Sequence, residues 1–421
     1  MKTHTNSIFY SLLGSLVFLL GSCTSSKQKE LSFIDDNIEF AVAQTELLLK
    51  AVGEPNGKNY PRTTNNEGDL ITTSMYDWTP GFFPGSLWYL YELTEQESWL
   101  KAAQSWTHSL EPLQTFTANH DLGFMMYCSY GNAQRLAPQP EYNEILLNSA
   151  KSLASRYNEN TKTIKSWNYR LAWNDTVEWF YPVIIDNMMN LELLFYGTKI
   201  SNDPLYRDIA ITHANSTLAN HFREDFSSYH VVNYDQETGE VLDRGTNQGY
   251  SNNSTWARGQ AWAIYGYTLM YRETKDIDYL TSAVQMANWF LTNLPADGIP
   301  LWDFNAGKEG YNPELKSHAK QFAGETLKDV SAAAIACSAL FELAECSDNA
   351  KYRESAIEMI HQLASPKYRA NLGENGHFIL KHSVGSIPHV SEIDKPLVYA
   401  DYYFLESLAR YRNYLTKGSI Y

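Results

Sequence analysis

The chain has 421 residues, of which 44% are hydrophobic and 19% charged, a composition typical of a globular protein with a large core. Asp and Glu number 48 against 33 Lys and Arg, and the resulting formal charge of −15 argues against a surface that binds nucleic-acid phosphates. Four cysteines are too few for a disulfide scaffold. Aromatic residues make up 14% of the chain, an abundance that suits stacking on sugar rings or the packing of large helices.

The N-terminus has the pattern of a targeting segment and is set apart from the fold. Lys2 precedes an apolar stretch over 8–20 that is too short to span a bilayer, and Leu20-Gly21-Ser22-Cys23 follows. This tetrapeptide resembles the lipobox of bacterial lipoproteins. We therefore predict a signal peptide over 1–22, lipidation of Cys23, a polar tether over 23–32 and a place in the bacterial cell envelope, on its periplasmic or outer-surface side. The alternative is a plain secretory signal with an incidental cysteine.

Apolar residues three or four positions apart predict that most of the remaining chain is helical, with 33–421 forming one domain. Strand alternation is scarce. The expected helices cover 34–52, 85–110, 142–157, 182–197, 204–222, 255–275, 277–294, 329–345, 350–364 and 395–415.

A weak internal repeat predicts how these helices are arranged. Four joints share a polar turn followed by an aromatic residue that opens the next helix, at Trp99, Tyr206, Tyr279 and Tyr352, and the three tyrosines recur at intervals of 73 residues. At roughly 65 residues per hairpin the chain holds about six hairpins, which predicts an all-α (α/α)6 barrel. An open solenoid fits less well, because its units are usually ~34–47 residues long with short connections.

Several catalytic motifs are absent from the sequence. It contains no His-Glu-x-x-His, Cys-x-x-Cys or Gly-x-Ser-x-Gly, and no Gly-x-Gly-x-x-Gly that opens a helix. Zinc, nucleotide and serine-hydrolase chemistry therefore receive little support.

Two aspartates are candidates for acid–base chemistry. Asp186 interrupts the apolar start of a predicted helix, where burial would raise the pKa of its carboxyl and let it hold a proton near neutral pH. A helix-capping role is an equally good interpretation. Asp121 lies in a loop beside a glycine and, taken alone, is more typical of a turn residue. Paired across a cavity, however, Asp121 would hydrogen-bond sugar hydroxyls and keep the proton on Asp186 by like-charge repulsion.

The segment 248–262 is the densest cluster of candidate binding residues. Trp256 and Trp262 offer stacking faces and Arg258 offers a planar fork for a carboxylate, although such tryptophans are more often core residues and such arginines more often solvated. Gly259 costs stability in the first turn of a helix, which indicates that another group approaches it closely.

Two further segments are candidate parts of a binding cleft. His230 lies in an apolar patch, where a lone histidine is more often a structural residue than a functional one. The loop 76–85, which contains Trp78, is rich in Gly, Pro and aromatic residues and is a candidate cleft wall.

Together these segments resemble glycoside hydrolase family 88, the unsaturated glucuronyl hydrolases, over about residues 70–410. The resemblance implies an (α/α)6 barrel and a reaction that needs no metal and no cofactor. The resembling blocks, in chain order, are 77–82, 120–124, 186–190, 248–262, and a C-terminal block of 329–332 with 399–403.

The resemblance also implies the substrate and the reaction. Polysaccharide lyases leave oligosaccharides with a C4=C5 unsaturated uronic acid at the non-reducing end, glycosaminoglycan-type disaccharides among them. By analogy, Asp186 protonates C4, positive charge develops at C5 and the ring oxygen, and water adds at C5 with Asp186 now acting as base. The resulting hemiketal opens and releases the next sugar.

The same resemblance implies the binding residues. It makes Asp121 the hydroxyl-binding partner of Asp186. The chain's negative charge repels an anionic sugar, so the site is expected to need a locally positive pocket around Arg258 and protonatable histidines. Polar contacts to the uronyl ring are implied for His120, His230, Gln248 and Arg258, and stacking for Trp78, Trp256 and Trp262.

A final match concerns the next sugar. Ser383 and Ser386 resemble a Ser-x-x-Ser pair with which family members contact it. Members that favour sulfated glycosaminoglycans follow this pair with x-Lys, whereas this chain has Ile387-Pro388. A strong preference for 6-sulfated disaccharides is therefore not expected, unless a lysine from another loop substitutes.

Two other functions stay open. Family 105, the unsaturated rhamnogalacturonyl hydrolases, shares the barrel and the chemistry, but the blocks around Asp121 and Gln248 fit it less well. A membrane-tethered glycan-binding protein without turnover is the second, and the presence of both Asp121 and Asp186 argues against it. An unsaturated uronyl oligosaccharide is the expected partner, and the sequence predicts no oligomeric state.

Overall fold

The computed structural model describes the backbone of residues 7–421 and the side chains of residues 27–421. The predicted signal peptide over 1–22 and the lipidation site Cys23 lie outside the residues whose side chains are described. The predicted tether over 23–32 falls within helix α1 (Ser7–Val52). Contacts between α1 and the rest of the domain include those of Glu30, which accepts hydrogen bonds from His361 (2.8 Å) and Tyr411 (2.9 Å) ahead of the predicted start at residue 33.

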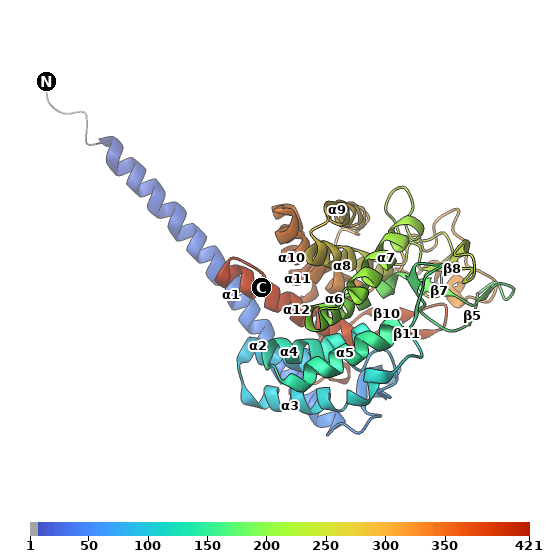
Figure 1. The fold of residues 1–421 in the computed structure, drawn as a ribbon. Helices are drawn as coiled ribbons and strands as arrows, with labels where there is room; N and C mark the ends of the chain where they lie inside the picture. The colour runs from blue at the N-terminus through green and yellow to red at the C-terminus, as the bar shows by residue number, and fades with distance from the viewer. Residues whose placement is uncertain (1–6) are drawn as a thin grey trace.

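An inner ring of helices forms the centre of the molecule (Figure 1). Each member contacts the next, and the last returns to the first, so the ring closes. The closed ring excludes the open solenoid. In order the ring contains α2 (Phe82–Thr94), the π-helix η2 (Gly123–Gly131) continued by α4 (Asn132–Leu136), the 3-10 helix η3 (Ile185–Asn190) continued by α6 (Leu191–Ser201), α8 (Ala257–Thr274), α10 (Val330–Ser347) and α12 (Val398–Lys417).

An outer helix packs on each inner one, so the predicted (α/α)6 barrel of six hairpins is confirmed. Among the helices with described side chains, α10 alone is long and apolar enough to cross a membrane, and 83% of it is buried, as in the core helix of a barrel. The outer helices are α3 (Glu97–His108), α5 (Pro140–Ala154), α7 (Leu205–Asn220), α9 (Ile277–Thr292), α11 (Ala350–Leu363) and α1.

The repeat seen in the sequence has a backbone cause. At each of the four joints the inner helix ends on a residue in the left-handed conformation, whose N–H bonds a carbonyl of the last turn so that the chain reverses tightly. The aromatic residue that follows is buried under each reversal. The left-handed residues are Glu95, Asn202, Lys275 and Asp348, with φ between 49° and 61°.

Three regions differ from the expected helices. No helix is predicted between residues 110 and 142, yet residues 123–131 form the π-helix η2, whose side chains lack the spacing that marks an α-helix. The helix expected over 182–197 begins as strand β7 (Pro182–Ile184), and the one over 85–110 is two helices, α2 and α3.

Short two- and three-stranded sheets interrupt the connections between hairpins. Those labelled in Figure 1 lie at one end of the barrel, at the starts of inner helices. The pairs are β1 (Tyr60–Thr64) with β2 (Leu70–Thr73), β3 (Tyr157–Asn158) with β4 (Thr163–Ile164), β5 (Arg170–Leu171) with β6 (Glu178–Trp179), β7 with β8 (Val231–Tyr234) and β9 (Val241–Gly245), and β10 (Ser383–Ser386) with β11 (Ser391–Lys395).

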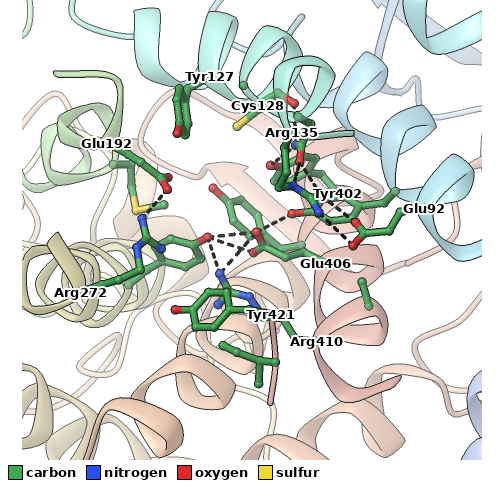
Figure 2. A pocket seen from close by; sticks show the side chains of 18 of the residues that line it. Glu92, Tyr127, Cys128, Arg135, Glu192, Arg272, Tyr402, Glu406, Arg410 and Tyr421 are labelled. Atoms are coloured by element: carbon green, nitrogen blue, oxygen red, sulfur yellow. Dashed lines mark hydrogen bonds and ion pairs between the residues drawn. The ribbon is translucent and has the colours of Figure 1, made fainter. Parts of the chain in front are cut away.

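The other end of the barrel, where the inner helices finish, holds a cavity of about 620 Å³ (Figure 2). Arg410 pairs there with Glu342 at 3.0 Å and lies 3.6 Å from Glu406, which also accepts hydrogen bonds from the hydroxyls of Tyr89 and Tyr265. Cationic side chains at the carboxyl ends of helices offset the partial negative charge of those ends. None of the predicted site residues lines this cavity, which is therefore separate from the candidate site.

Candidate active site

The starts of the inner helices bring the candidate residues together. Because consecutive hairpins run up and down, all inner helices point the same way and their N-termini meet at one end. Partial positive charge at six helix N-termini favours an anionic ligand even in a protein of net charge −15. The residues at this end include Trp78 before α2, Asp121 before η2, Asp186 in η3, Trp256 at the N-cap of α8, Asp329 at the N-cap of α10 and Tyr399 in the first turn of α12.

Asp121 and Asp186 form a buried, coupled pair. Their exposed fractions are 8% and 7%. Burial raises the pKa of Asp186 to about 7, and burial together with the charge of Asp186 raises the pKa of Asp121 to about 8. The pair therefore retains a proton near neutral pH, as expected, but burial alone does not assign that proton to Asp186.

The capping interpretation of Asp186 is wrong. The N-cap of η3 is Ile184, and no side-chain capping bond is made there. Instead, the backbone N–H of Ile185 donates to the carbonyl of His230 at 3.1 Å, an extension of the pairing between β7 and β8 that sets Asp186 beside His230.

His230 is a neutral donor aimed at Asp186. Its Nδ1 accepts hydrogen bonds from the backbone N–H groups of Asn247 (3.0 Å) and Gln248 (3.2 Å), so the ring proton lies on Nε2. That Nε2 lies 3.7 Å from Oδ2 of Asp186. Burial, with the positive charge of Arg258, holds the pKa of His230 well below its usual range.

His120 repeats this arrangement beside the other carboxyl. Its Nδ1 lies 3.4 Å from the side-chain amide nitrogen of Asn190, and its Nε2 lies 3.3 Å from Oδ1 of Asp121. Burial lowers the pKa of His120 to about 3. The expectation that protonated histidines make the site positive is therefore wrong, because His120 and His230 are both neutral N–H donors.

The terminal nitrogens of Arg258 are hydrogen-bonded within the protein. Its terminal nitrogens donate to Oδ2 of Asp329 (2.9 Å) and to the carbonyls of Val384 (2.5 Å) and Gly385 (2.7 Å). The fork expected to bind a substrate carboxylate is thus occupied, and only Nε has no partner. Its charge still lowers the pKa of Asp186, and its bonds hold β10 at the site.

The three tryptophans lie at this end of the barrel, and Trp256 and Trp262 are buried in hydrophobic clusters there. Trp262 is fully buried, 5.1 Å from the ring of Phe124, and lies close enough to Asp186 to lower the pKa of that carboxyl. Trp256 packs against His230 with ring centroids 4.6 Å apart. Trp78 is half-buried, with its ring 4.9 Å from that of Tyr399.

The predicted close approach to Gly259 is confirmed. A Cβ atom there would lie 3.0 Å from the ring of Trp256 and 3.1 Å from the side chain of Ile185. A larger residue would push on the backbone next to Asp186, so this glycine sets the spacing of the site.

The remaining predicted residues lie along β10. Gln248 donates from Nε2 to the carbonyl of Gly385 at 3.3 Å. Ser383 is buried with its Oγ unpartnered, and Oγ of Ser386 lies 2.5 Å from Nδ1 of His389. These residues line the same end of the barrel as the aspartates.

Buried polar atoms without a partner concentrate at this end. Buried polar groups in folded proteins are nearly always hydrogen-bonded, so such a concentration indicates a ligand rich in polar groups. The unpartnered atoms are Oδ2 of Asp186, Nε2 of His230, Nε1 of Trp256 and of Trp262, Nε of Arg258, Oγ of Ser383 and the hydroxyl of Tyr399.

Two residues at the site were missed by sequence reasoning as binding residues. The Tyr399 hydroxyl is buried and unpartnered, with its ring 5.3 Å from the Arg258 guanidinium. Trp167 meets His230 edge to face, with centroids 6.4 Å apart. Tyr399 carries a usable signal, because it opens the last inner helix; Trp167 lies in an irregular loop that no periodicity marks.

Comparisons with known proteins agree with this geometry. The model of Glycosyl Hydrolase Family 88 matches residues 55–278. An unsaturated glucuronyl hydrolase of Formosa agariphila is 42% identical over 97% of this chain and 99% of its own. An unsaturated chondroitin disaccharide hydrolase of Streptococcus pyogenes is 31% identical over 90% of this chain and 91% of its own.

Solved structures give the same result. An unsaturated glucuronyl hydrolase specific for heparin superposes with a TM-score of 0.82, at 43% identity, covering 91% of this chain and 97% of the other. A mutant unsaturated glucuronyl hydrolase of Streptococcus agalactiae, complexed with dGlcA-GalNAc6S, superposes with a TM-score of 0.70, at 28% identity, covering 89% of this chain and 90% of the other. The chain belongs to Glycosyl Hydrolase Family 88.

Proposed function

We propose that this glycoside hydrolase removes the unsaturated uronic acid from the non-reducing end of lyase-generated oligosaccharides, with glycosaminoglycan-type disaccharides as its substrates. The names of its relatives support the substrate class. The observation that carries the proposal is the coupled pair of Asp121 and Asp186 among unpartnered polar atoms and aromatic rings, at the end of the barrel where helix N-termini favour an anion.

In the proposed reaction Asp186 gives its proton to C4 of the double bond, and positive charge develops at C5 and the ring oxygen. The new carboxylate of Asp186 stabilises that charge, and the Nε2–H of His230 faces the carboxylate. Water then adds at C5 and returns a proton to Asp186, which restores the starting carboxyl. The hemiketal opens the ring and releases the next sugar.

Asp121 has a binding and tuning role in this proposal. Its carboxyl accepts a hydroxyl of the uronyl ring, while the neutral His120 orients it from behind. Repulsion between the two carboxylates raises the pKa of Asp121, and in this proposal the same repulsion keeps the shared proton on Asp186 until C4 accepts it.

The conjugated double bond gives a direct test. Defined unsaturated disaccharides from chondroitin, hyaluronan and heparin are incubated with the protein, and we expect their ultraviolet absorbance to fall as C4=C5 is hydrated. An unsaturated galacturonyl-rhamnose serves as the comparison substrate. Unchanged absorbance on every uronide despite measurable binding would make the protein a glycan-binding module, and turnover of the comparison substrate alone would contradict the substrate class.

We also propose that Cys23 carries a lipid that holds the enzyme in the bacterial cell envelope. The lipobox-like tetrapeptide that ends at Cys23 supports this. In a bacterial host, Cys23→Ser is expected to move the protein from the membrane to the soluble fraction and to abolish its labelling by a fatty acid, whereas Cys128→Ser leaves both unchanged. A wild-type protein that is soluble and unlabelled would contradict the proposal.

A further inference from the structure

Asn190 is a buried polar residue to which the proposed reaction gives no role. It is fully buried at the end of η3, the short helix that carries Asp186. Its side-chain oxygen accepts the backbone N–H groups of Gly123 (2.8 Å) and Phe124 (3.3 Å) at the start of η2. Asp121 lies two residues before Gly123. One side chain therefore ties the segment that carries Asp186 to the segment that carries Asp121.

The two segments are in direct contact at Asn190. A Cβ atom on Gly123 would lie 2.6 Å from Oδ1 of Asn190 and closer still to its Cα, nearer than non-bonded atoms approach. Gly123 does not have a positive φ, so glycine is needed here for this close approach and not for an unusual backbone angle. The contact therefore fixes how closely η2 and η3 approach each other, and with them the two carboxyls whose repulsion raises the pKa of Asp121.

The amide of Asn190 also directs the proton of His120. Because its oxygen faces two backbone N–H groups, its nitrogen faces the other way, 3.4 Å from Nδ1 of His120. The hydroxyl oxygen of Ser166 accepts the N–H of Ile184 at 3.0 Å and lies 3.4 Å from the same Nδ1, to which its hydrogen points as a second donor. With donors on this side Nδ1 accepts, and the neutral ring keeps its proton on Nε2, 3.3 Å from Oδ1 of Asp121.

We propose that Asn190 is a positioning residue for the hydration of the double bond: it sets the spacing of the segments that carry the two aspartates and, through His120, presents an N–H to Asp121. The inference rests on the proposed function and deepens it. An N–H that faces a carboxyl favours its charged form. This is the form that Asp121 has in the proposed reaction while Asp186 holds the proton.

Asn190→Ala tests this role by kinetics, with initial rates taken from the loss of ultraviolet absorbance of an unsaturated disaccharide. We expect kcat to fall by about 10- to 10²-fold, because small displacements of catalytic groups are costly. KM should rise by less than about threefold, since the fully buried side chain is out of reach of the substrate.

Asn132→Ala is the matched control. Asn132 is also buried and joins α4 to α12, with its amide 3.2 Å from the hydroxyl of Tyr402, but it lines the cavity at the end of the barrel where the inner helices finish. We expect this variant to lose stability and to keep its kcat. A normal kcat in folded Asn190→Ala would overturn the inference, and so would an equal fall in kcat in both variants.

A second measurement does not depend on how the variant folds. Nitrogen NMR of histidine-labelled wild-type protein reports which ring nitrogen of His120 carries the proton, and the absence of the signal from His120→Gln assigns it. We expect the proton on Nε2, and a proton on Nδ1 alone would overturn the inference. Failure of the proposed function shows differently, as a wild-type protein that consumes no unsaturated disaccharide, whereas failure of this inference leaves the wild type and Asn190→Ala equally active.

Discussion

Asp186→Asn is expected to lower kcat on unsaturated disaccharides by about 10²-fold or more, the scale of general acid–base catalysis. Asparagine keeps the shape of the side chain but has no proton to give to C4 and no carboxylate to stabilise the positive charge at C5. KM should change little, because the side chain still occupies the same place among Trp262 and His230. Initial rates from the loss of ultraviolet absorbance measure both constants.

A matched control for this variant is Asp401→Asn. Asp401 is also buried at the start of an inner helix with its pKa raised to about 7, but its oxygens accept the backbone N–H groups of Ile379 and Leu380. We expect this variant to lose stability rather than kcat, since it breaks structural bonds away from the pair. Near-normal turnover by Asp186→Asn, with a folded protein by circular dichroism, would place the acid elsewhere.

Asp121→Asn is expected to lower kcat/KM by about tenfold or more and to move the alkaline limb of the pH profile to lower pH. The repulsion that raises the pKa of Asp121 acts on whichever carboxyl keeps the shared proton, and in the proposed reaction that carboxyl is Asp186. Without the charge of Asp121 the pKa of Asp186 falls, Asp186 loses its proton at a lower pH, and activity is lost earlier as pH rises. Measuring kcat between about pH 5 and pH 9 reports this limb.

The direction of that shift is the decisive result. An alkaline limb that stays in place would mean that Asp121 contributes hydroxyl binding without tuning its neighbour. A limb that moves to higher pH would contradict the coupling itself. Neither outcome follows from loss of stability, because unfolding lowers activity without moving the pKa of the remaining folded enzyme.

The barrel could be predicted from the sequence because the joints between its helices repeat as a recognisable sequence pattern. Each reversal needs a residue that tolerates positive φ and a large aromatic to cover it, and Tyr206, Tyr279 and Tyr352 mark such reversals at equal spacing. Signals of this kind lie within a short segment of sequence, so they can be recognised without knowing which distant residues the segment contacts. The π-helix at 123–131 could not be predicted in this way, since its side chains follow no α-helical period.

The identity of the site residues was easier to predict than their chemical state. Sequence patterns pointed to His230 and Arg258, but the state of each depends on partners far along the chain. The proton of His230 is placed by backbone N–H groups at 247 and 248, and Arg258 is occupied by Asp329 and β10. Such pairings are fixed only when the hairpins close into a ring, so no pattern within one segment could show them.

The direction of α1 fixes the end of the barrel at which the N-terminal segment leaves the domain. Glu30 accepts a hydrogen bond from Tyr411, which lies towards the end of α12. Strand β1, which follows α1, carries Arg62, and Arg62 pairs with Asp77 at the end of the barrel that holds the candidate site. The chain ahead of Glu30 therefore leaves the barrel at the end where the inner helices finish (Figure 1). In the lipid-anchored form that we propose, Cys23 would therefore lie on the side of the barrel opposite the candidate site, and the anchor would leave the entry of oligosaccharides to that site unobstructed.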